Sequence, residues 1–109
     1  MNETIDFFLK KYLDKIKTNF DPQEMWIWGS YVYGNPRKDS DLDVVVISNE
    51  FKKYRFIQRS SKVTKELRTW ADREIPEIDF ICYTPDEFEK KKNQISLARE
   101  ITTKGLKIL

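Results

Sequence analysis

Trp28-Gly29-Ser30 and Asp41-Leu42-Asp43-Val44-Val45-Val46-Ile47 are the two segments that decide the fold of this chain. An aromatic and β-branched run at residues 25–28 ends at Gly29, which predicts a strand leading into a tight turn. A polar loop follows, and residues 41–48 predict a second strand, whose far half is apolar enough to be buried on both faces.

The rest of the chain alternates between helical and strand patterns. Residues 3–17 predict an amphipathic helix, residues 54–71 a second helix and residues 78–83 a third strand. Thr84-Pro85-Asp86-Glu87 suits a helix start, and residues 88–101 predict a last helix that Gly105 ends. We therefore expect one domain over residues 1–109, of the α/β (α+β) class, with a small mixed sheet flanked by helices. The helical residues expected to face the core are Ile5, Phe8, Leu9, Tyr12, Leu13, Ile16, Ile57, Val63, Leu67, Trp70, Ile95, Leu97 and Ala98.

Composition excludes several kinds of chemistry. The 109 residues include no His, which removes Ser-His-Asp and Cys-His catalysis and the His-containing zinc sites. The single cysteine, Cys82, lies in an apolar run and is expected to be a buried, unreactive thiol, which suits a reducing cytoplasm. The net charge is only +2, and no apolar run is long enough to span a bilayer, so we expect neither a membrane protein nor a nucleic-acid binder.

Two phosphate or metal motifs match the central segment only superficially. Gly29 and Gly34 have the glycine spacing of a Walker A loop, but Asn35-Pro36 stands where Lys-Ser/Thr is required. The acids of residues 39–50 match some positions of a calcium loop, but Val44 occupies the position that needs glycine. Neither motif explains the segment.

The spacing of Asp41 and Asp43 favours a magnesium site instead. Side chains two residues apart lie on one face of a strand, roughly 6 to 7 Å apart, while Leu42 between them points into the core. Two carboxylates so placed repel each other unless a cation joins them, and Mg²⁺ needs only one or two protein carboxylates beside substrate phosphate oxygens. Gly29 lets backbone approach the phosphates, and Ser30 offers an amide and a hydroxyl to them.

The pattern Trp28-Gly29-Ser30, ten residues, then Asp41-Leu42-Asp43-Val44 resembles the signature of the nucleotidyltransferase superfamily that includes DNA polymerase beta and kanamycin nucleotidyltransferase. The order of predicted helices and strands resembles its minimal, stand-alone members. These often carry a third carboxylate on a later strand, where this chain has Asp79.

The resemblance implies catalytic and metal-binding roles for Asp41, Asp43 and Asp79, which would hold two Mg²⁺ ions during transfer of a nucleoside monophosphate from a nucleoside triphosphate to a hydroxyl. Asp79 could also accept the proton of the acceptor. Gly29, Ser30, Arg37 and Ser40 are the candidate nucleotide and phosphate-binding residues. Lys38 could share the role of Arg37, and Tyr31 or Tyr33 could stack on the base.

The resemblance also suggests a partner. Minimal members of the superfamily frequently act as the antitoxin of a pair, transferring AMP to a tyrosine of a helical HEPN-type toxin. A chain this short has little material for an acceptor pocket, so either such a partner or a homo-oligomer is expected to complete the site. Two alternatives stay open: transfer to a small molecule such as an aminoglycoside, and a non-catalytic module that binds a nucleotide or a partner.

Several of these residues also have an ordinary structural interpretation. Residues 39–41 could form a turn, and Ser30 alone could be a helix cap. Asp79 could lie on an exposed strand face without a function. The three tryptophans are expected in the core rather than as a platform for bases, and Lys90-Lys91-Lys92 is expected to be a solvated helix surface.

Overall fold

The computed structural model describes residues 2–34, 36 and 40–109. A mixed four-stranded sheet in the order β3-β2-β1-β4 forms its centre. Strand β1 (Glu24–Trp28) is antiparallel to β2 (Leu42–Ile47) and to β4 (Leu106–Lys107), while β2 and β3 (Ile78–Tyr83) are parallel. The predicted fold class, a small mixed sheet flanked by helices, is confirmed.

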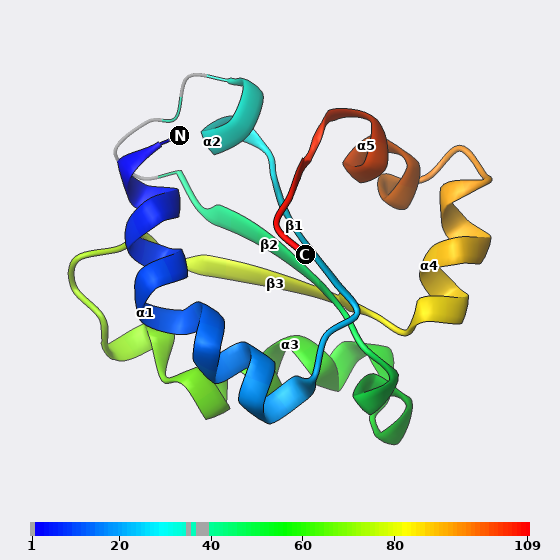
Figure 1. Cartoon of the computed structure of the whole chain (residues 1–109), viewed down its shortest axis with the longest axis horizontal. Coiled ribbons are helices and arrows are strands. Elements are labelled where there is room, and N and C mark those ends of the chain that lie inside the picture. Colours follow the sequence, from blue (N-terminus) through cyan, green and yellow to red (C-terminus); the bar gives the residue numbers. More distant parts are fainter. Residues whose placement is uncertain (1, 35, 37–39) are drawn as a thin grey trace.

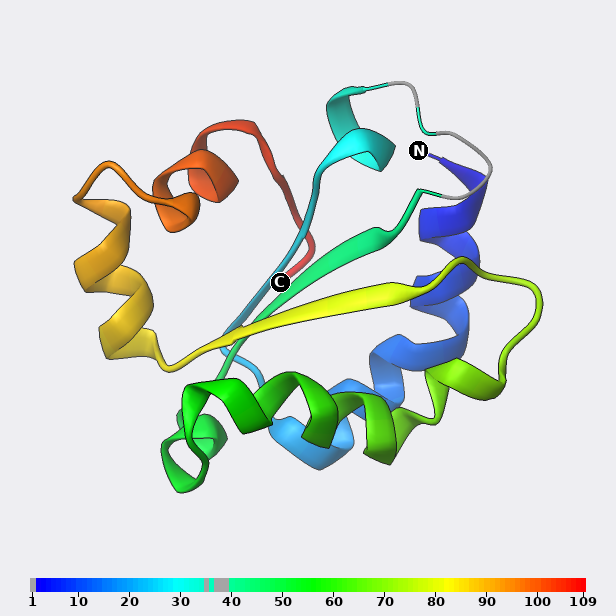
Figure 2. The same cartoon turned by 180° about the vertical axis from the view of Figure 1, so that it is seen from behind.

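The sheet separates two groups of helices (Figures 1 and 2). Helices α1 (Glu3–Phe20) and α3 (Phe56–Leu67) lie on one side, and α4 (Pro85–Lys92) and α5 (Leu97–Lys104) on the other. The short helix α2 (Ser30–Tyr33) follows β1, while the 3₁₀ segments η1 (Asn49–Lys53) and η2 (Thr69–Ala71) flank α3. Among the described residues, no helix has the length and apolarity needed to cross a membrane.

Strand alternation builds two cores, one on each face of the sheet. Leu42, Val44 and Val46 of β2 face α1 and α3, within the larger apolar cluster. Val45 and Ile47 face the opposite way, toward α4 and α5, in a smaller cluster with Tyr83, Phe88, Ala98 and Ile101. The prediction that the far half of this strand is buried on both faces is confirmed.

The first helix matches its prediction and runs three residues further. The side chain of Asn2 caps its first turn, and Asp21, in the left-handed conformation, ends it. Ile5, Phe8, Tyr12 and Ile16 are buried as expected, and Leu9 and Leu13 pack half-buried against the same core. Cys82 is buried and free, and burial raises the pKa of its thiol to about 12, as expected of an inert cysteine.

The predicted helix over residues 54–71 is wrong at both ends. Helix α3 ends at Leu67 because Arg68 adopts a left-handed conformation, so the periodicity does not continue to Trp70, which is 67% exposed. Ile57 is also outside the core, at 82% exposed. Arg59 takes its place on the buried stripe with Val63 and Leu67.

Arg59 is buried because it is fully engaged. Its guanidinium donates to Glu87 at 2.6 and 3.2 Å and to the carbonyl oxygen of Cys82 at 3.2 Å. Burial works against ionisation of Glu87, but hydrogen bonds from Arg59 and from the Thr84 cap outweigh it and lower the pKa of Glu87. This ion pair joins α3 to the start of α4.

The single helix predicted over residues 88–101 is two helices. The side chain of Ser96 caps α5 by accepting from the Arg99 amide, so a new helix starts there and Ile95 is left 96% exposed. Leu97 is 37% exposed, whereas Ala98 is buried as predicted. The predicted helix start at residues 84–87 is confirmed by a complete capping box between Thr84 and Glu87.

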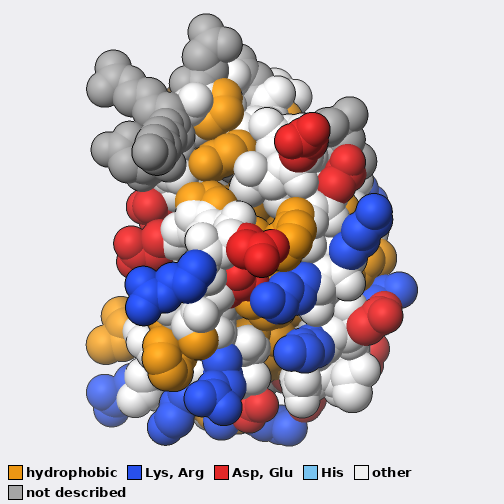
Figure 3. All heavy atoms as spheres, turned by 90° about the vertical axis from the view of Figure 1, so that its left-hand side faces the viewer, with side chains coloured by type: hydrophobic (Ala, Val, Ile, Leu, Met, Phe, Trp, Pro, Cys, Tyr) orange, Lys and Arg blue, Asp and Glu red, His pale blue; other side chains and the backbone are white. Residues whose placement is uncertain are grey.

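The opposite charges of the chain are interspersed over the side of the molecule seen in Figure 3, where Lys and Arg side chains alternate with Asp and Glu side chains. Lys90, Lys91 and Lys92 lie in the last turn of α4, and the first two are exposed, as expected of a solvated surface. As far as its residues are described, the side of the molecule in Figure 3 therefore has no extended field of one sign.

Candidate active site

Asp43 and Asp79 are direct neighbours across the parallel pair of β2 and β3. Paired strands lie about 4.8 Å apart, and register partners share a face, so both carboxylates project from the same side of the sheet. Asp41, two residues before Asp43, is exposed at the entrance of β2, and Asp43 itself is half-buried. The structure therefore places the three acids that the sequence singled out on one face of the sheet, near enough for Asp41 and Asp79 to act on Asp43 but not in a closed three-acid cluster. We call this end of the sheet the acid corner.

The three acids are left electrostatically unbalanced. The pKa of Asp43 rises from 3.8 to about 6, first because burial disfavours its charge and then because Asp79 and Asp41 repel it. No Lys or Arg within residues 2–34, 36 and 40–109 forms an ion pair with any of the three. A cation from outside the described chain would relieve this repulsion.

Gly29 forms the other wall beside Asp43. Trp28 is the register partner of Asp43 on β1, so Gly29 follows directly at the end of that strand. Its φ of 93° suits glycine, and a Cβ atom there would lie 2.5 Å from Oδ2 of Asp43. The backbone at Gly29 thus passes the carboxylate at a distance that no side chain would permit.

Helix α2 and its contact with Ser40 border the acid corner on the side of Gly29. Ser30 is its first residue, and the hydroxyl of Tyr31 donates to the carbonyl oxygen of Ser40 at 3.1 Å. That bond joins Tyr31, next to Ser30, to Ser40, next to Asp41. Arg37, Lys38 and Asp39 lie outside the described residues, as does the side chain of Tyr33.

Trp26 and Trp28 lie on the same face of the sheet as Asp43. Both pack half-buried against the smaller core cluster, as expected of core residues, whereas the expectation of a buried Trp70 was wrong. The indole nitrogen of Trp26 donates to Glu24 at 3.3 Å.

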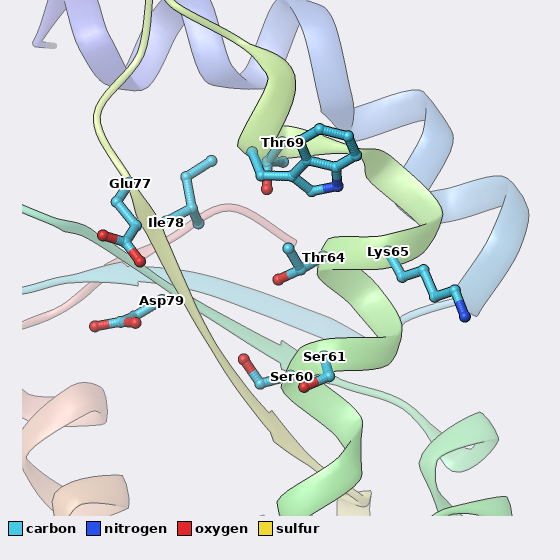
Figure 4. Close-up of a pocket in the computed structure, with 9 residues that line it drawn as sticks. Ser60, Ser61, Thr64, Lys65, Thr69, Glu77, Ile78 and Asp79 are labelled. Atoms are coloured by element: carbon cyan, nitrogen blue, oxygen red, sulfur yellow. The ribbon is translucent and has the colours of Figure 1, made fainter.

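Glu77 is a fourth acid that the sequence analysis missed. The amide of Leu42 donates to the carbonyl oxygen of Glu77 at 2.9 Å, which extends the ladder of β2 and β3 by one residue and sets Glu77 level with Asp41. Glu77 and Asp79 project to the same side (Figure 4). The signal was present in the sequence, because Glu77-Ile78-Asp79 repeats the spacing of Asp41-Leu42-Asp43.

The chain matches one known protein family over most of its length. Residues 9–108 match the model of the nucleotidyltransferase domain. The chain belongs to this family. No curated protein matches the chain significantly.

Two solved plant structures share the arrangement of elements with this nucleotidyltransferase domain. BolA1 from Arabidopsis thaliana is 18% identical, with a TM-score of 0.56 over 80% of this chain and 98% of that one. The BolA domain of SufE1 from Arabidopsis thaliana is 17% identical, with a TM-score of 0.52 over 69% of this chain and 88% of that one. At these identities the likeness shows the fold alone.

The acid corner of the nucleotidyltransferase domain has the donors that a hard cation prefers. Asp41, Asp43 and Asp79 offer only carboxylate oxygens, and the bare backbone of Gly29 lies directly against the Asp43 carboxylate. Within the described part of the chain, no three acidic or cysteine side chains are gathered closely enough to hold an ion by themselves. Mg²⁺ takes few protein ligands and completes its shell with water and phosphate oxygens, so one or two of these carboxylates would be enough for it.

A pocket of about 340 Å³ opens on the outer side of β3. Asp79 lies on its rim, so the pocket adjoins the acid corner directly (Figure 4). Its lining comes from α3, η2 and the start of β3, and consists of Ser60, Ser61, Thr64, Lys65, Thr69, Trp70, Glu77, Ile78 and Asp79.

Proposed function

We propose that this nucleotidyltransferase domain moves a nucleoside monophosphate, AMP from ATP, to a hydroxyl group in a reaction that depends on Mg²⁺. The observation that carries the proposal is the position of Asp43, which lies between the bare backbone of Gly29 on one strand and Asp79 on the other. A half-buried acid held beside two further acids costs stability, and binding of a cation and a triphosphate would repay that cost.

Asp41, Asp43 and Asp79 would hold the Mg²⁺ ions. When bound, these ions would neutralise the triphosphate and the leaving pyrophosphate and would favour ionisation of the acceptor hydroxyl. The phosphates would approach the backbone at Gly29, which has no side chain, and the hydroxyl of Ser30, the first residue of α2, would donate to a phosphate oxygen.

The transfer itself is a displacement at the α-phosphorus. The acceptor oxygen forms a bond to that phosphorus, the bond from the phosphorus to the bridging oxygen breaks, and pyrophosphate leaves with the electron pair. Asp79, exposed on the outer of the two acid-bearing strands, would accept the proton of the acceptor hydroxyl.

We propose a partner protein of the HEPN type as the acceptor, modified on a tyrosine, so that the chain acts as the antitoxin of a pair. The acid corner is open on the described residues, with Asp41 and Asp79 both exposed, and a partner would supply the missing wall. A reducing cytoplasm suits the buried free thiol of Cys82.

Transfer of label tests the function. ATP labelled at the α-phosphate is incubated with Mg²⁺, the chain, and the product of the neighbouring gene, and label in the protein bands is measured. We expect label in the partner, lost in the double variant Asp41→Asn with Asp43→Asn and retained in Asp86→Asn, whose side chain is 90% exposed on α4. Absence of nucleotide binding in the wild type would refute the proposal. Nucleotide binding without transfer to any acceptor would identify a binding module.

A further inference from the structure

The pocket beside Asp79 has walls that are built to bind a polar molecule. Thr69 is only 8% exposed, lines the pocket, and points its hydroxyl toward it (Figure 4). Among the described residues, neither this hydroxyl nor those of Ser60, Ser61 and Thr64 makes a hydrogen bond. The Thr69 hydroxyl is open to the pocket and is not a fully buried group, so water can bond to it there and a ligand in the pocket would replace that water.

Other helical hydroxyls of this chain behave differently. On α5, Thr102 and Thr103 donate to the carbonyl oxygen of Arg99 at 3.0 and 2.8 Å, which is the ordinary arrangement for such side chains in helices. The hydroxyl-lined face of α3 is therefore distinguished by geometry from the polar face of α5, although the residue types are the same.

The pocket also has a definite charge. Glu77 and Asp79 both border it, with Asp41 and Asp43 in the adjoining strand. The one basic residue of the lining, Lys65, extends from α3 away from these carboxylates (Figure 4). The exposed indole of Trp70 completes the wall, and its ring already has the guanidinium of Arg68 at 5.7 Å. The carboxylates favour a cation, and the Arg68 contact shows that this indole accepts one beside its ring.

The position of the pocket suits one half of an in-line displacement. Across the sheet the order is the pocket, Asp79 on β3, Asp43 on β2, and Gly29 with Ser30 after β1. Attacking and leaving oxygens lie on opposite sides of the phosphorus. If the pyrophosphate leaves on the side of Gly29, the attacking hydroxyl must approach from the side of the pocket.

Resting on the proposed function, we propose that this pocket holds the acceptor, and that Thr69, Trp70 and Glu77 select a hydroxyl carried by a positively charged molecule. The volume of about 340 Å³ accommodates one side chain or one sugar-sized ring. A tyrosine flanked by Lys or Arg in a protein and a small amino alcohol both have this chemistry. A nucleic acid does not, because its phosphates would meet the carboxylates.

Acceptor selection tests the proposal. The probes are a tyrosine peptide flanked by lysines, the same peptide flanked by glutamates, and glucosamine against glucose, each with Mg²⁺ and α-labelled ATP. We expect the cationic member of at least one pair to be labelled with a kcat/KM about tenfold higher. Labelling of only the peptide pair identifies a protein acceptor, and labelling of only the amino sugar identifies a small one. Equal labelling within both pairs, or labelling of no probe by a wild type that binds ATP, would overturn the proposal.

Variants locate the selection. Glu77→Lys is expected to abolish the preference for the cationic probe, and Thr69→Val and Trp70→Ala to raise the KM for it about fivefold, with the affinity for Mg²⁺ and ATP unchanged. Glu74→Lys and Thr103→Val are matched controls outside the pocket, and both should behave as wild type. Unchanged selectivity in Glu77→Lys would overturn the inference while leaving nucleotidyl transfer intact.

Binding without turnover gives an independent measurement. In the variant Asp43→Asn, the lysine-flanked peptide made with phenylalanine in place of tyrosine should quench tryptophan fluorescence, and Trp70→Ala in that background should remove the quenching. Quenching that persists without Trp70, or that is equal for the glutamate-flanked peptide, would contradict the assignment. A wild-type chain that does not bind ATP would instead refute the proposed function itself.

Discussion

Two halves of one sheet face contrast in this domain. Under α4 and α5, Val45 and Ile47 of β2 are completely buried against Phe88, Ala98 and Ile101. Two residues earlier on the same strand and face, Asp43 lies beside Asp79 and Asp41, and its pKa is raised to about 6. Among the described residues, the first half is packed against apolar partners, whereas the acids of the second half have no basic partner.

The contrast teaches that the pairing of β2 with β3 holds the carboxylates of Asp43 and Asp79 side by side. Strand register sets Asp43 opposite Asp79, and the absence of a side chain at Gly29 leaves room for the Asp43 carboxylate. A domain selected for stability alone would not keep such a corner. The covered half stabilises the domain, and the acid half binds a ligand in our account.

The largest expected effect is on chemistry. Asp43→Asn keeps the shape of the side chain but removes its charge, and should lower nucleotidyl transfer by about a thousandfold, the range seen when one group that stabilises the transition state is lost. Release of pyrophosphate measures it. The exposed Asp86→Asn is the control, and a loss of less than tenfold would break the contrast between the two halves.

A change in the covered half should act on stability instead. Phe88 is 1% exposed and packs on Tyr83 with ring centroids 5.6 Å apart, so Phe88→Ala should lower the free energy of unfolding by about 3 to 5 kcal/mol. Urea denaturation measures this change. At a temperature where the variant is folded, its affinity for Mg²⁺ and ATP should stay within about twofold of wild type; a larger change would show that the halves are coupled.

Gly29→Ala should lower both nucleotidyl transfer and stability. The alanine must adopt a φ of 93°, and its Cβ would contact Oδ2 of Asp43. We expect the free energy of unfolding to fall by about 1 to 3 kcal/mol and transfer to be lost. Gly34→Ala is the control: its φ of −115° suits any residue, and its Cβ would lie 3.2 Å from Cα of Ser30, so it should cost less. In an Asp43→Ala background the penalty should shrink, because the contact is gone. An unchanged penalty in that background would assign the whole effect to backbone strain.

The smallest expected effect is on the pH dependence of stability. Because the folded pKa of Asp43 is raised from 3.8 to about 6, the folded chain binds more protons than the unfolded chain between these values. In EDTA, stability should therefore fall as pH rises from about 4 to 6, by about 1 to 2 kcal/mol. Asp43→Asn should lack this fall and be more stable than wild type at pH 7. Parallel urea midpoints for the two proteins across this range would contradict the raised pKa.

The sequence predicted the elements that depend on local patterns. Strand residues, the helix at residues 3–17 and the capping box at Thr84 all follow from spacing and caps. The neighbouring position of Asp79 came from a family resemblance, because the register between two strands far apart in sequence has no local signal.

The errors have a common cause in tertiary contacts. Ile57 and Ile95 fit helical periodicity, yet the ion pair of Arg59 with Glu87 and the cap at Ser96 turn the helices so that both are exposed. Glu77 was missed although Glu77-Ile78-Asp79 repeats the spacing of the first pair of acids, because its position level with Asp41 depends on the hydrogen bond that its carbonyl oxygen accepts from Leu42. Local propensity does not encode such contacts.

The most direct test of the central claim is an NMR titration of the Asp43 side-chain carboxyl carbon. Without divalent cation, this carbon should titrate near the raised pKa of about 6. With saturating Mg²⁺ and a non-hydrolysable ATP analogue, bound charge of opposite sign should move the midpoint below about 4. A midpoint that stays near 6 with Mg²⁺ and the analogue present would contradict the account.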